Sequence, residues 1–270
     1  MLKLRLITAI ALATIFVLAL YTLPDLGWSL FLLIFILIGA WEWAGLSGFH
    51  SAGKRWFLGL TVLITAALLP GVSEAARHTG AVLLTVAAAG FWIFISPWWL
   101  SRRWHLRHPV GLALTGWLLL LPAWMALIDL RHISPAVVLL VILVVAVADS
   151  AAYFSGKRFG KRKLAPEISP GKTWEGLVGA LLAVTLFGIG LCLWLGWSFW
   201  FLPGLWLLTI FSVLGDLFES LIKRQAGKKD SGTILPGHGG VLDRIDGLTP
   251  TLPLVAFYAY LPYFVEIAFR

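Results

Sequence analysis

Long apolar stretches alternate with short polar loops along the whole chain. Nine apolar segments follow one another between residues 6 and 267, and most are close to the roughly 17–25 residues that a membrane-spanning helix needs. Because lipid offers the backbone no hydrogen-bond partners, a spanning segment satisfies its own N–H and C=O groups as a helix. The pattern therefore predicts an all-α integral membrane protein with about nine transmembrane helices. The segments are residues 6–23, 28–43, 57–72, 81–100, 110–128, 135–153, 174–195, 199–217 and 252–267.

The composition agrees with a membrane protein. Of the 270 residues, 60% are hydrophobic and the mean hydropathy is +0.90, which excludes an ordinary soluble domain. The 15 Trp and 17 Phe residues suit aromatic belts at two membrane interfaces. The single cysteine, Cys192, lies in an apolar run, so neither a disulfide framework nor a zinc site is expected. The net charge of +8 comes from short loops between apolar segments, so we expect no nucleic-acid partner.

The basic residues predict the orientation of the chain. When the two sides of the membrane are assigned alternately from the N-terminus, 18 of the 21 Lys and Arg residues fall on one side, and Arg77, Arg131 and Arg270 fall on the other. Since short cytoplasmic loops are enriched in Lys and Arg, we expect the N-terminus in the cytoplasm and the C-terminus outside. The first segment follows Lys3 and Arg5, but no small-residue cleavage site closes it, so we expect a retained anchor.

Charged residues other than topology determinants gather in the second half of the chain. We therefore expect two regions: about five membrane helices that form a scaffold with lipid access (1–134), and a catalytic region with about four (135–270). Two cytoplasmic loops, 155–173 and 220–250, would carry much of the polar chemistry. Glu42, at the cytoplasmic end of the second segment, is an acid in the first half, and it would either snorkel or cap locally, or line a cavity.

An unusual density of charge begins at the end of the eighth segment. One helical face would carry residues at i, i+3, i+4, i+7 and i+8, namely Asp216, Glu219, Ser220, Lys223 and Arg224. Carboxylates suit Mg²⁺, which takes one or two of them together with substrate phosphates. Lys and Arg beside them suit the charge of a polyphosphate. The alternative is a solvated cytosolic loop whose charges only orient the protein.

The residues that follow carry the same chemistry. Glycines surround His238, so the backbone turns there or approaches a ligand closely. Asp243 and Asp246 lie three residues apart and flank Arg244. Glycine-rich backbone beside carboxylates and cations indicates metal-assisted phosphoryl or nucleotidyl transfer.

A second group of polar residues surrounds the loop between the sixth and seventh segments. Asp149 lies inside the sixth segment, where an ionisable side chain is a functional candidate, and Tyr153 follows one turn later. The turn from Ser169 to Thr173, which contains Lys172, opens the seventh segment and could bind an anion at the helix N-terminus. The alternative is a helix cap beside charges that set topology. We expect the basic run Lys161-Arg162-Lys163 to set topology and to draw anionic lipid to the surface.

The stretch from 220 to 246 resembles the signature of the phosphatidate cytidylyltransferases, also called CDP-diacylglycerol synthases. Two more segments are similar to that family, from Asp149 to Gly156 and from Ser169 to Gly176; many members have Lys where this chain has Gly171, which leaves Lys172 as the candidate cation. The signature residues here are Ser220, Lys223-Arg224, Lys229-Asp230, Pro236-Gly237-His238-Gly239-Gly240 and Asp243-Arg244-Ile245-Asp246.

The resemblance implies a nucleotidyltransferase of phospholipid biosynthesis in the bacterial inner membrane. It would convert CTP and phosphatidate into CDP-diacylglycerol and pyrophosphate with Mg²⁺, and the resemblance suggests a second cation such as K⁺. The catalytic site would lie at the cytoplasmic interface of the membrane. The chain could also form a homodimer. Catalytic residues would be Asp216, Ser220, Lys223, Arg224, Asp243, Arg244 and Asp246, with Asp216, Asp243 and Asp246 as metal ligands. Substrate would contact Asp149, Tyr153, Ser169, Lys172, Thr173, Lys229, Asp230, His238, Gly239 and Gly240.

Two other functions share part of this pattern. Another CTP-dependent lipid kinase or a polyprenyl-phosphate transferase would use the same arrangement of metal and cations. A secondary transporter would also carry acids within its membrane helices. However, transporter sites usually lie near the midplane of paired halves, whereas the acids of this chain lie near segment ends in its second half.

Overall fold

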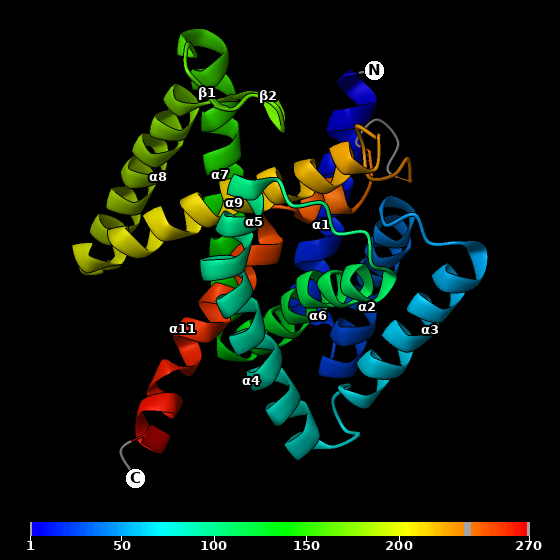
Figure 1. The fold of residues 1–270 in the computed structure, drawn as a ribbon. Helices are drawn as coiled ribbons and strands as arrows, with labels where there is room; N and C mark the ends of the chain where they lie inside the picture. Colours follow the sequence, from blue (N-terminus) through cyan, green and yellow to red (C-terminus); the bar gives the residue numbers. More distant parts are fainter. Residues whose placement is uncertain (1, 235–238, 269–270) are drawn as a thin grey trace.

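The computed structural model describes residues 2–234 and 239–268, and the side chains of 8–234 and 239–262. Helical structure covers most of each of the nine predicted apolar segments (Figure 1). The helices are α1 (Leu2–Thr22), α2 (Asp25–Leu46), α3 (Ser51–Ala67), α4 (Glu74–Gly90), the π-helical η1 (Phe91–Ile95), α5 (Ser96–Arg102), α6 (Pro109–Ile133), α7 (Pro135–Phe159), α8 (Trp174–Leu195), the 3₁₀ turn η2 (Phe199–Phe201), α9 (Leu202–Gln225), α10 (Leu242–Ile245) and α11 (Leu248–Ala268).

Six helical stretches within the described residues are long and apolar enough to cross a membrane, against the nine that the sequence predicts. The part of α1 whose side chains are described, Thr8–Thr22, is a further apolar helix, and α3 has 17 residues. The third predicted segment is wrong at its end, because the helix stops at Ala67 and a turn containing Pro70 and Gly71 follows. The chain is therefore an all-α, multi-pass membrane protein with at least this set of candidate spans. The six are Asp25–Leu46, Glu74–Arg102, Pro109–Ile133, Pro135–Phe159, Trp174–Leu195 and Phe199–Gln225.

The core of the first half forms where α2 and α6 pack together. The indole N–H of Trp43 donates to the carbonyl oxygen of Leu112 at 2.8 Å, and that of Trp124 donates to the carbonyl oxygen of Ser29 at 3.1 Å. Both indoles are fully buried, so these bonds remove the penalty for an unpaired polar group in an apolar interior. Gly116 lies against the Trp43 ring, where a Cβ would collide with it. The large aromatic side chains thus fix how closely α2 and α6 approach each other.

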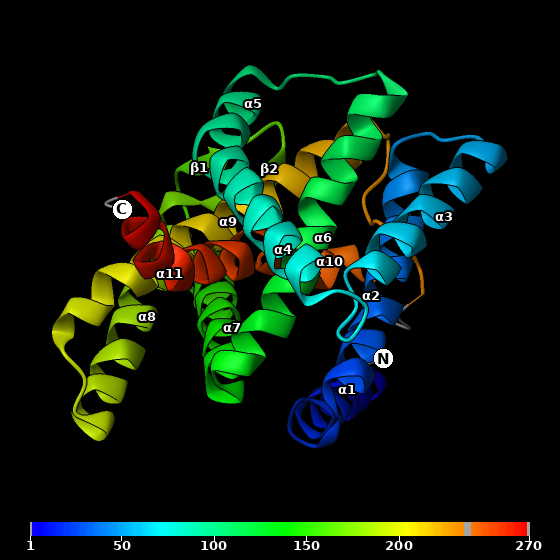
Figure 2. The ribbon, with the colours of Figure 1, turned by 90° about the horizontal axis from the view of Figure 1, so that it is seen from below.

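In the second half, α7 and α8 form an antiparallel pair, and α9 crosses it (Figures 1 and 2). A two-stranded antiparallel hairpin joins the pair, with β1 (Lys163–Ala165) opposite β2 (Ser169–Thr173). The sequence indicated only a loop at this place. Thr173 ends the hairpin and caps α8, since its hydroxyl accepts the N–H of Gly176 at 3.1 Å. The hairpin therefore holds β2 directly beside the ends of α7 and α8.

A polar network ties three helices together at the end of the molecule away from the hairpin. Arg77 of α4 lies 2.9 Å from Asp129 of α6, whose other oxygen accepts the hydroxyl of Tyr260 of α11 at 2.7 Å. Arg131 donates to the carbonyl oxygen of Leu20 at 2.9 Å. Two of the three basic residues that the charge pattern places outside are thus bound internally, whereas Arg270 lies outside the described residues.

The orientation of the chain leads to a labelling prediction. Figure 1 shows the first turn of α1 and the last turn of α11 at opposite ends of the molecule. In a Cys192→Ser background, we expect Lys228→Cys to escape an impermeant thiol reagent added to intact cells and to react after permeabilisation. Val72→Cys, exposed in the turn between α3 and α4, should react in intact cells and serves as the control. Labelling of position 228 in intact cells would reverse the orientation.

Candidate active site

A cleft of about 700 Å³ lies between the ends of α7 and α8, the β-hairpin, α9 and the segment around α10. All of its lining residues fall between 149 and 246, within the half of the chain that the sequence assigns to catalysis. The cleft brings together eleven of the seventeen predicted site residues. These are Asp149, Tyr153, Ser169, Lys172, Thr173, Asp216, Lys223, Asp230, Asp243, Arg244 and Asp246.

Asp216 lies on the wall of the cleft that α9 forms. One of its carboxylate oxygens is 2.5 Å from the ammonium group of Lys172 in β2, and the other accepts the Ser220 hydroxyl at 3.3 Å. Lys172 also donates to the carbonyl oxygen of Val213 at 3.4 Å. Ser220 thus lies behind Asp216 rather than in the cleft, one helical turn along α9 as its spacing predicts. The β-hairpin and α9 are joined here by an ion pair that lines the cleft.

Asp246 faces the same space from the segment between α10 and α11. Its carboxylate accepts the N–H of Gly247 at 2.7 Å. Burial, and next the negative charge of Asp216, raise the pKa of Asp246 to about 7. The close approach depends on Gly215, where a Cβ would collide with the carbonyl oxygen of Asp246 and the ring of Pro250. Two carboxylates from separate elements therefore repel each other across the cleft, and a cation would relieve that repulsion.

Asp243 has a different set of partners. One oxygen binds the ammonium group of Lys223 at 2.6 Å, and the other accepts the N–H and the hydroxyl of Ser231 and the N–H of Gly240, each at 2.9 Å. Burial acts to raise the pKa of Asp243, but the hydrogen bonds from Lys223 and Gly240 outweigh it and hold the pKa below its ordinary value. Both oxygens of Asp243 thus organise the segment that surrounds them.

The remaining predicted site residues lie beside the cleft, apart from those outside the described residues. The Arg224 guanidinium donates to the carbonyl oxygens of Ile168, at 3.4 Å, and Lys228, at 3.3 Å, so it joins two loops. Gly239, whose φ of +83° favours glycine, and Gly240 lie against the Asp243 and Glu42 carboxylates. Lys229 is exposed outside the cleft lining, and His238 lies outside the described residues.

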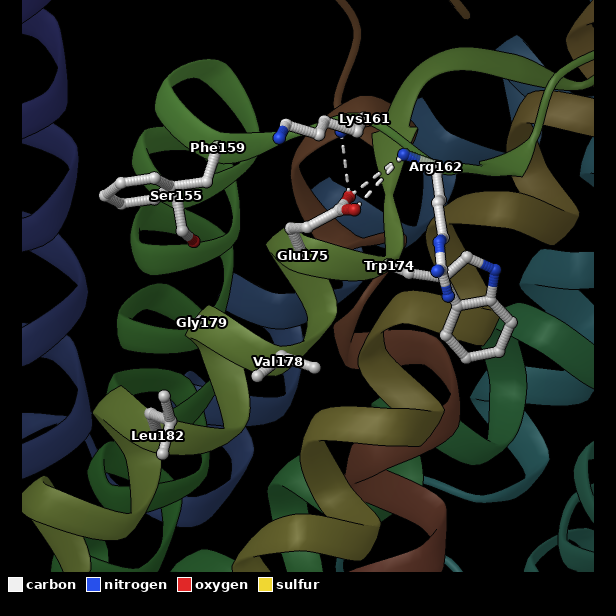
Figure 3. Close-up of a pocket in the computed structure, with 9 residues that line it drawn as sticks. All are labelled: Ser155, Phe159, Lys161, Arg162, Trp174, Glu175, Val178, Gly179 and Leu182. Atoms are coloured by element: carbon white, nitrogen blue, oxygen red, sulfur yellow. Dashed lines mark hydrogen bonds between the residues drawn. The ribbon is translucent and has the colours of Figure 1, made fainter.

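The sequence did not place Lys157 and Lys163 in the site, yet both line the cleft. The basic run is divided: Lys163 faces the cleft, whereas Lys161 and Arg162 line a separate groove of about 620 Å³ on another side of α7 and α8 (Figure 3). There the Glu175 carboxylate accepts the N–H groups of Lys161 and Arg162 at 3.0 and 3.2 Å. Only recognition of the β-hairpin could have separated Lys163 from its neighbours, because the division depends on where β1 begins.

The carboxylates of the cleft suit a magnesium ion in number and type. Across the residues whose side chains are described, no three His, Cys, Asp or Glu side chains are close enough to form a complete metal cage. Mg²⁺ does not need one, since it is usually held by one or two carboxylates together with substrate phosphates and water. Asp216 and Asp246 both line the cleft and offer such a pair.

Comparison with known proteins places the chain in a family. The model of the Cytidylyltransferase family matches residues 3–262. The chain is 40% identical, over 95% of its length and 96% of the relative, to a phosphatidate cytidylyltransferase of Pseudomonas aeruginosa. It is 33% identical to that of Haemophilus influenzae over 98% of its own length and 100% of the relative, and 50% identical to that of Bacillus subtilis over 40% and 42%. These similarities confirm the resemblance carried by the stretch from 220 to 246, and the chain belongs to the cytidylyltransferase family.

Proposed function

We propose that this chain is a phosphatidate cytidylyltransferase, which makes CDP-diacylglycerol and pyrophosphate from phosphatidate and CTP. The observation that carries the proposal is the cleft, where cations from β2, α9 and α10 meet carboxylates from α7, α9 and the segment after α10. Near-full-length relatives at 33–40% identity are phosphatidate cytidylyltransferases. The reaction belongs to phospholipid biosynthesis, and we place it at the cytoplasmic face of the bacterial inner membrane.

The main task of the protein in this reaction is to align the phosphatidate phosphate with the α-phosphate of CTP. An oxygen of the phosphatidate phosphate attacks the α-phosphorus of CTP, the bond from that phosphorus to the bridging oxygen breaks, and pyrophosphate leaves with the electron pair. The lipid phosphate is already an anion, so no strong general base is required. The cost lies in bringing two groups of like charge together, which oriented cations offset. Lys172, Lys223 and Arg244 line the cleft and supply that charge.

Asp216 and Asp246 are the residues that we propose to hold Mg²⁺. When bound, the ion would neutralise charge on the triphosphate and on the departing pyrophosphate. Lys172, which pairs with Asp216, would then be released to bind phosphate. Asp243 would have to break its ion pair with Lys223 before it could bind the metal. We therefore assign Asp243 first to holding Lys223 and the segment around Ser231. A second cation such as K⁺ and a homodimer remain predictions of the family resemblance.

Incorporation of labelled CTP into lipid by the purified protein tests the proposed substrate. We expect label in the lipid fraction with phosphatidate, and little with diacylglycerol or a polyprenyl phosphate. A preference for polyprenyl phosphate, with phosphatidate inert, would assign the chain to a different lipid substrate. Release of pyrophosphate in equal amount to the labelled lipid provides the check on stoichiometry.

The divided basic run gives a matched pair of variants. Lys161→Gln should raise the apparent KM for phosphatidate, by at most about fivefold at low salt and less at high salt, because a surface cation near anionic lipid contributes about 1 kcal/mol. Lys163→Gln, two residues away but in the cleft, should lower kcat instead. Initial rates at saturating CTP across phosphatidate and salt concentrations measure both. A severe loss of kcat in Lys161→Gln would place the outer groove in the catalytic machinery.

A further inference from the structure

Glu42 is a buried carboxylate in the first half of the chain, and its partners all belong to the second half. It lies in α2 and is 3% exposed. Its oxygens accept the N–H of Val241 at 3.0 Å, the N–H of Leu242 at 2.9 Å and the hydroxyl of Ser231 at 3.1 Å. These donors lie 189 to 200 residues away in the sequence. An unpaired buried carboxylate is costly, so Glu42 depends on the donors that Ser231, Val241 and Leu242 supply.

The fit around this carboxylate is close. A Cβ at Gly232 or at Gly240 would collide with the Glu42 side chain. One helical turn earlier on α2, Gly39 lies against the Leu242 side chain, and near the end of α2 the Gly45 carbonyl oxygen accepts Lys228 at 3.2 Å. The C-terminal half of α2 thus supports residues on both sides of the loop, near Lys228–Gly232 and near Gly240–Leu242.

Hydrogen bonds connect Glu42 to the cleft. The Ser231 hydroxyl lies 3.1 Å from the Glu42 carboxylate and 2.9 Å from that of Asp243. A hydroxyl has one hydrogen to donate, so the two carboxylates share one donor and are both in contact with Ser231. The other oxygen of Asp243 binds Lys223 at 2.6 Å. A continuous chain of contacts therefore runs from α2 through Ser231 and Asp243 to α9.

We propose that Glu42 is a positioning residue for cytidylyl transfer. By binding the N–H groups of Val241 and Leu242, it fixes the start of α10, and α10 in turn aims Asp243, Arg244 and Asp246 into the cleft. This role rests on the proposed function of the cleft. This role also explains why α2, a helix of the scaffold half, carries a buried acid. The Glu42 carboxylate binds backbone N–H groups at the start of α10, which belongs to the catalytic half.

The test is Glu42→Gln, which keeps the shape of the side chain. Its amide NH₂ would face a backbone N–H donor, so at least one of the three hydrogen bonds is lost. We expect kcat to fall about tenfold or more, the scale expected for losing a buried hydrogen bond to a charged group, with a smaller change in KM for CTP. The midpoint of thermal unfolding should stay within a few degrees. Glu74→Gln, an exposed acid on α4, is the matched control and should leave kcat unchanged.

A measurement independent of activity separates positioning from general stability. Hydrogen exchange of the peptide from 239 to 246 should accelerate in Glu42→Gln without ligand, while peptides from α6 exchange as in the wild type. Ser231→Ala combined with Glu42→Gln should cost less than the sum of the two single changes, because the residues share one network.

The outcomes distinguish this inference from the proposed function. A wild-type protein that transfers no cytidylyl group would overturn the proposed function, whatever Glu42 does. An active wild type whose Glu42→Gln variant has normal kcat, or exchanges normally at 239–246, would overturn the positioning role. A loss of kcat that only follows the fraction of unfolded protein would overturn it as well.

Discussion

Asp216→Asn should lower kcat by about a hundredfold or more while the protein remains folded. The change keeps the volume of the side chain but removes a charge that pairs with Lys172 at 2.5 Å and faces Asp246. If Asp216 holds the metal, its neutral amide also weakens metal binding, so the Mg²⁺ concentration for half-maximal rate should rise. A loss of this size is typical when one key electrostatic group is removed from an active site.

The control for Asp216→Asn is Asp25→Asn. Asp25 is a half-exposed acid at the start of α2, paired with Arg131 at 3.7 Å and distant from the cleft in sequence and fold. It should retain wild-type kcat and the wild-type Mg²⁺ requirement. Activity of Asp216→Asn within a few-fold of the wild type would assign Asp216 to structure.

Asp243→Asn should also lower kcat by about a hundredfold or more, for a different reason. The amide NH₂ cannot accept the hydrogen bonds of Ser231 and Gly240, and Lys223 loses its close counter-charge at 2.6 Å. We therefore expect Lys223 and the segment around α10 to lose their alignment. Because Asp243 already uses both oxygens within the protein, the half-maximal Mg²⁺ concentration should remain near the wild-type value.

Comparing the two Asp→Asn variants separates metal holding from loop positioning. Rates measured over a range of Mg²⁺ concentrations provide the test, with circular dichroism to verify that both variants fold. A raised Mg²⁺ requirement in Asp243→Asn, similar to that of Asp216→Asn, would return Asp243 to the metal ligands. Equal activity of Asp243→Asn and the wild type would remove it from the site.

Apolar length and helical spacing predicted much of the fold. A long apolar segment in lipid satisfies its backbone as a helix, and helical structure covers most of each of the nine predicted segments. Spacing along one helix also placed Ser220 next to Asp216 correctly. One boundary was wrong, since α3 ends at Ala67 rather than at residue 72. Six of the predicted spans are long and apolar enough to cross a membrane within the described residues, and the full count of nine stays a prediction.

The short β-hairpin could not be predicted from its residues. Its strands, Lys163–Ala165 and Ser169–Thr173, are too short and too polar to show the alternation of a half-buried strand. Pairing them divides the basic run, so that Lys163 faces the cleft while Lys161 does not. The partners of Glu42 were equally hidden, since contacts across some 190 to 200 residues leave no periodic signal.

A cytidylyltransferase and a CTP-dependent lipid kinase differ in which phosphate of CTP reaches the lipid. Purified protein is supplied with phosphatidate and with CTP labelled at either the α- or the γ-phosphate, and the lipid and aqueous products are separated. We expect α-label to enter the lipid and γ-label to leave as pyrophosphate. Asp216→Asn should abolish most of the labelled lipid and most of the labelled pyrophosphate. Transfer of γ-label into lipid would show a CTP-dependent lipid kinase and would contradict the assignment.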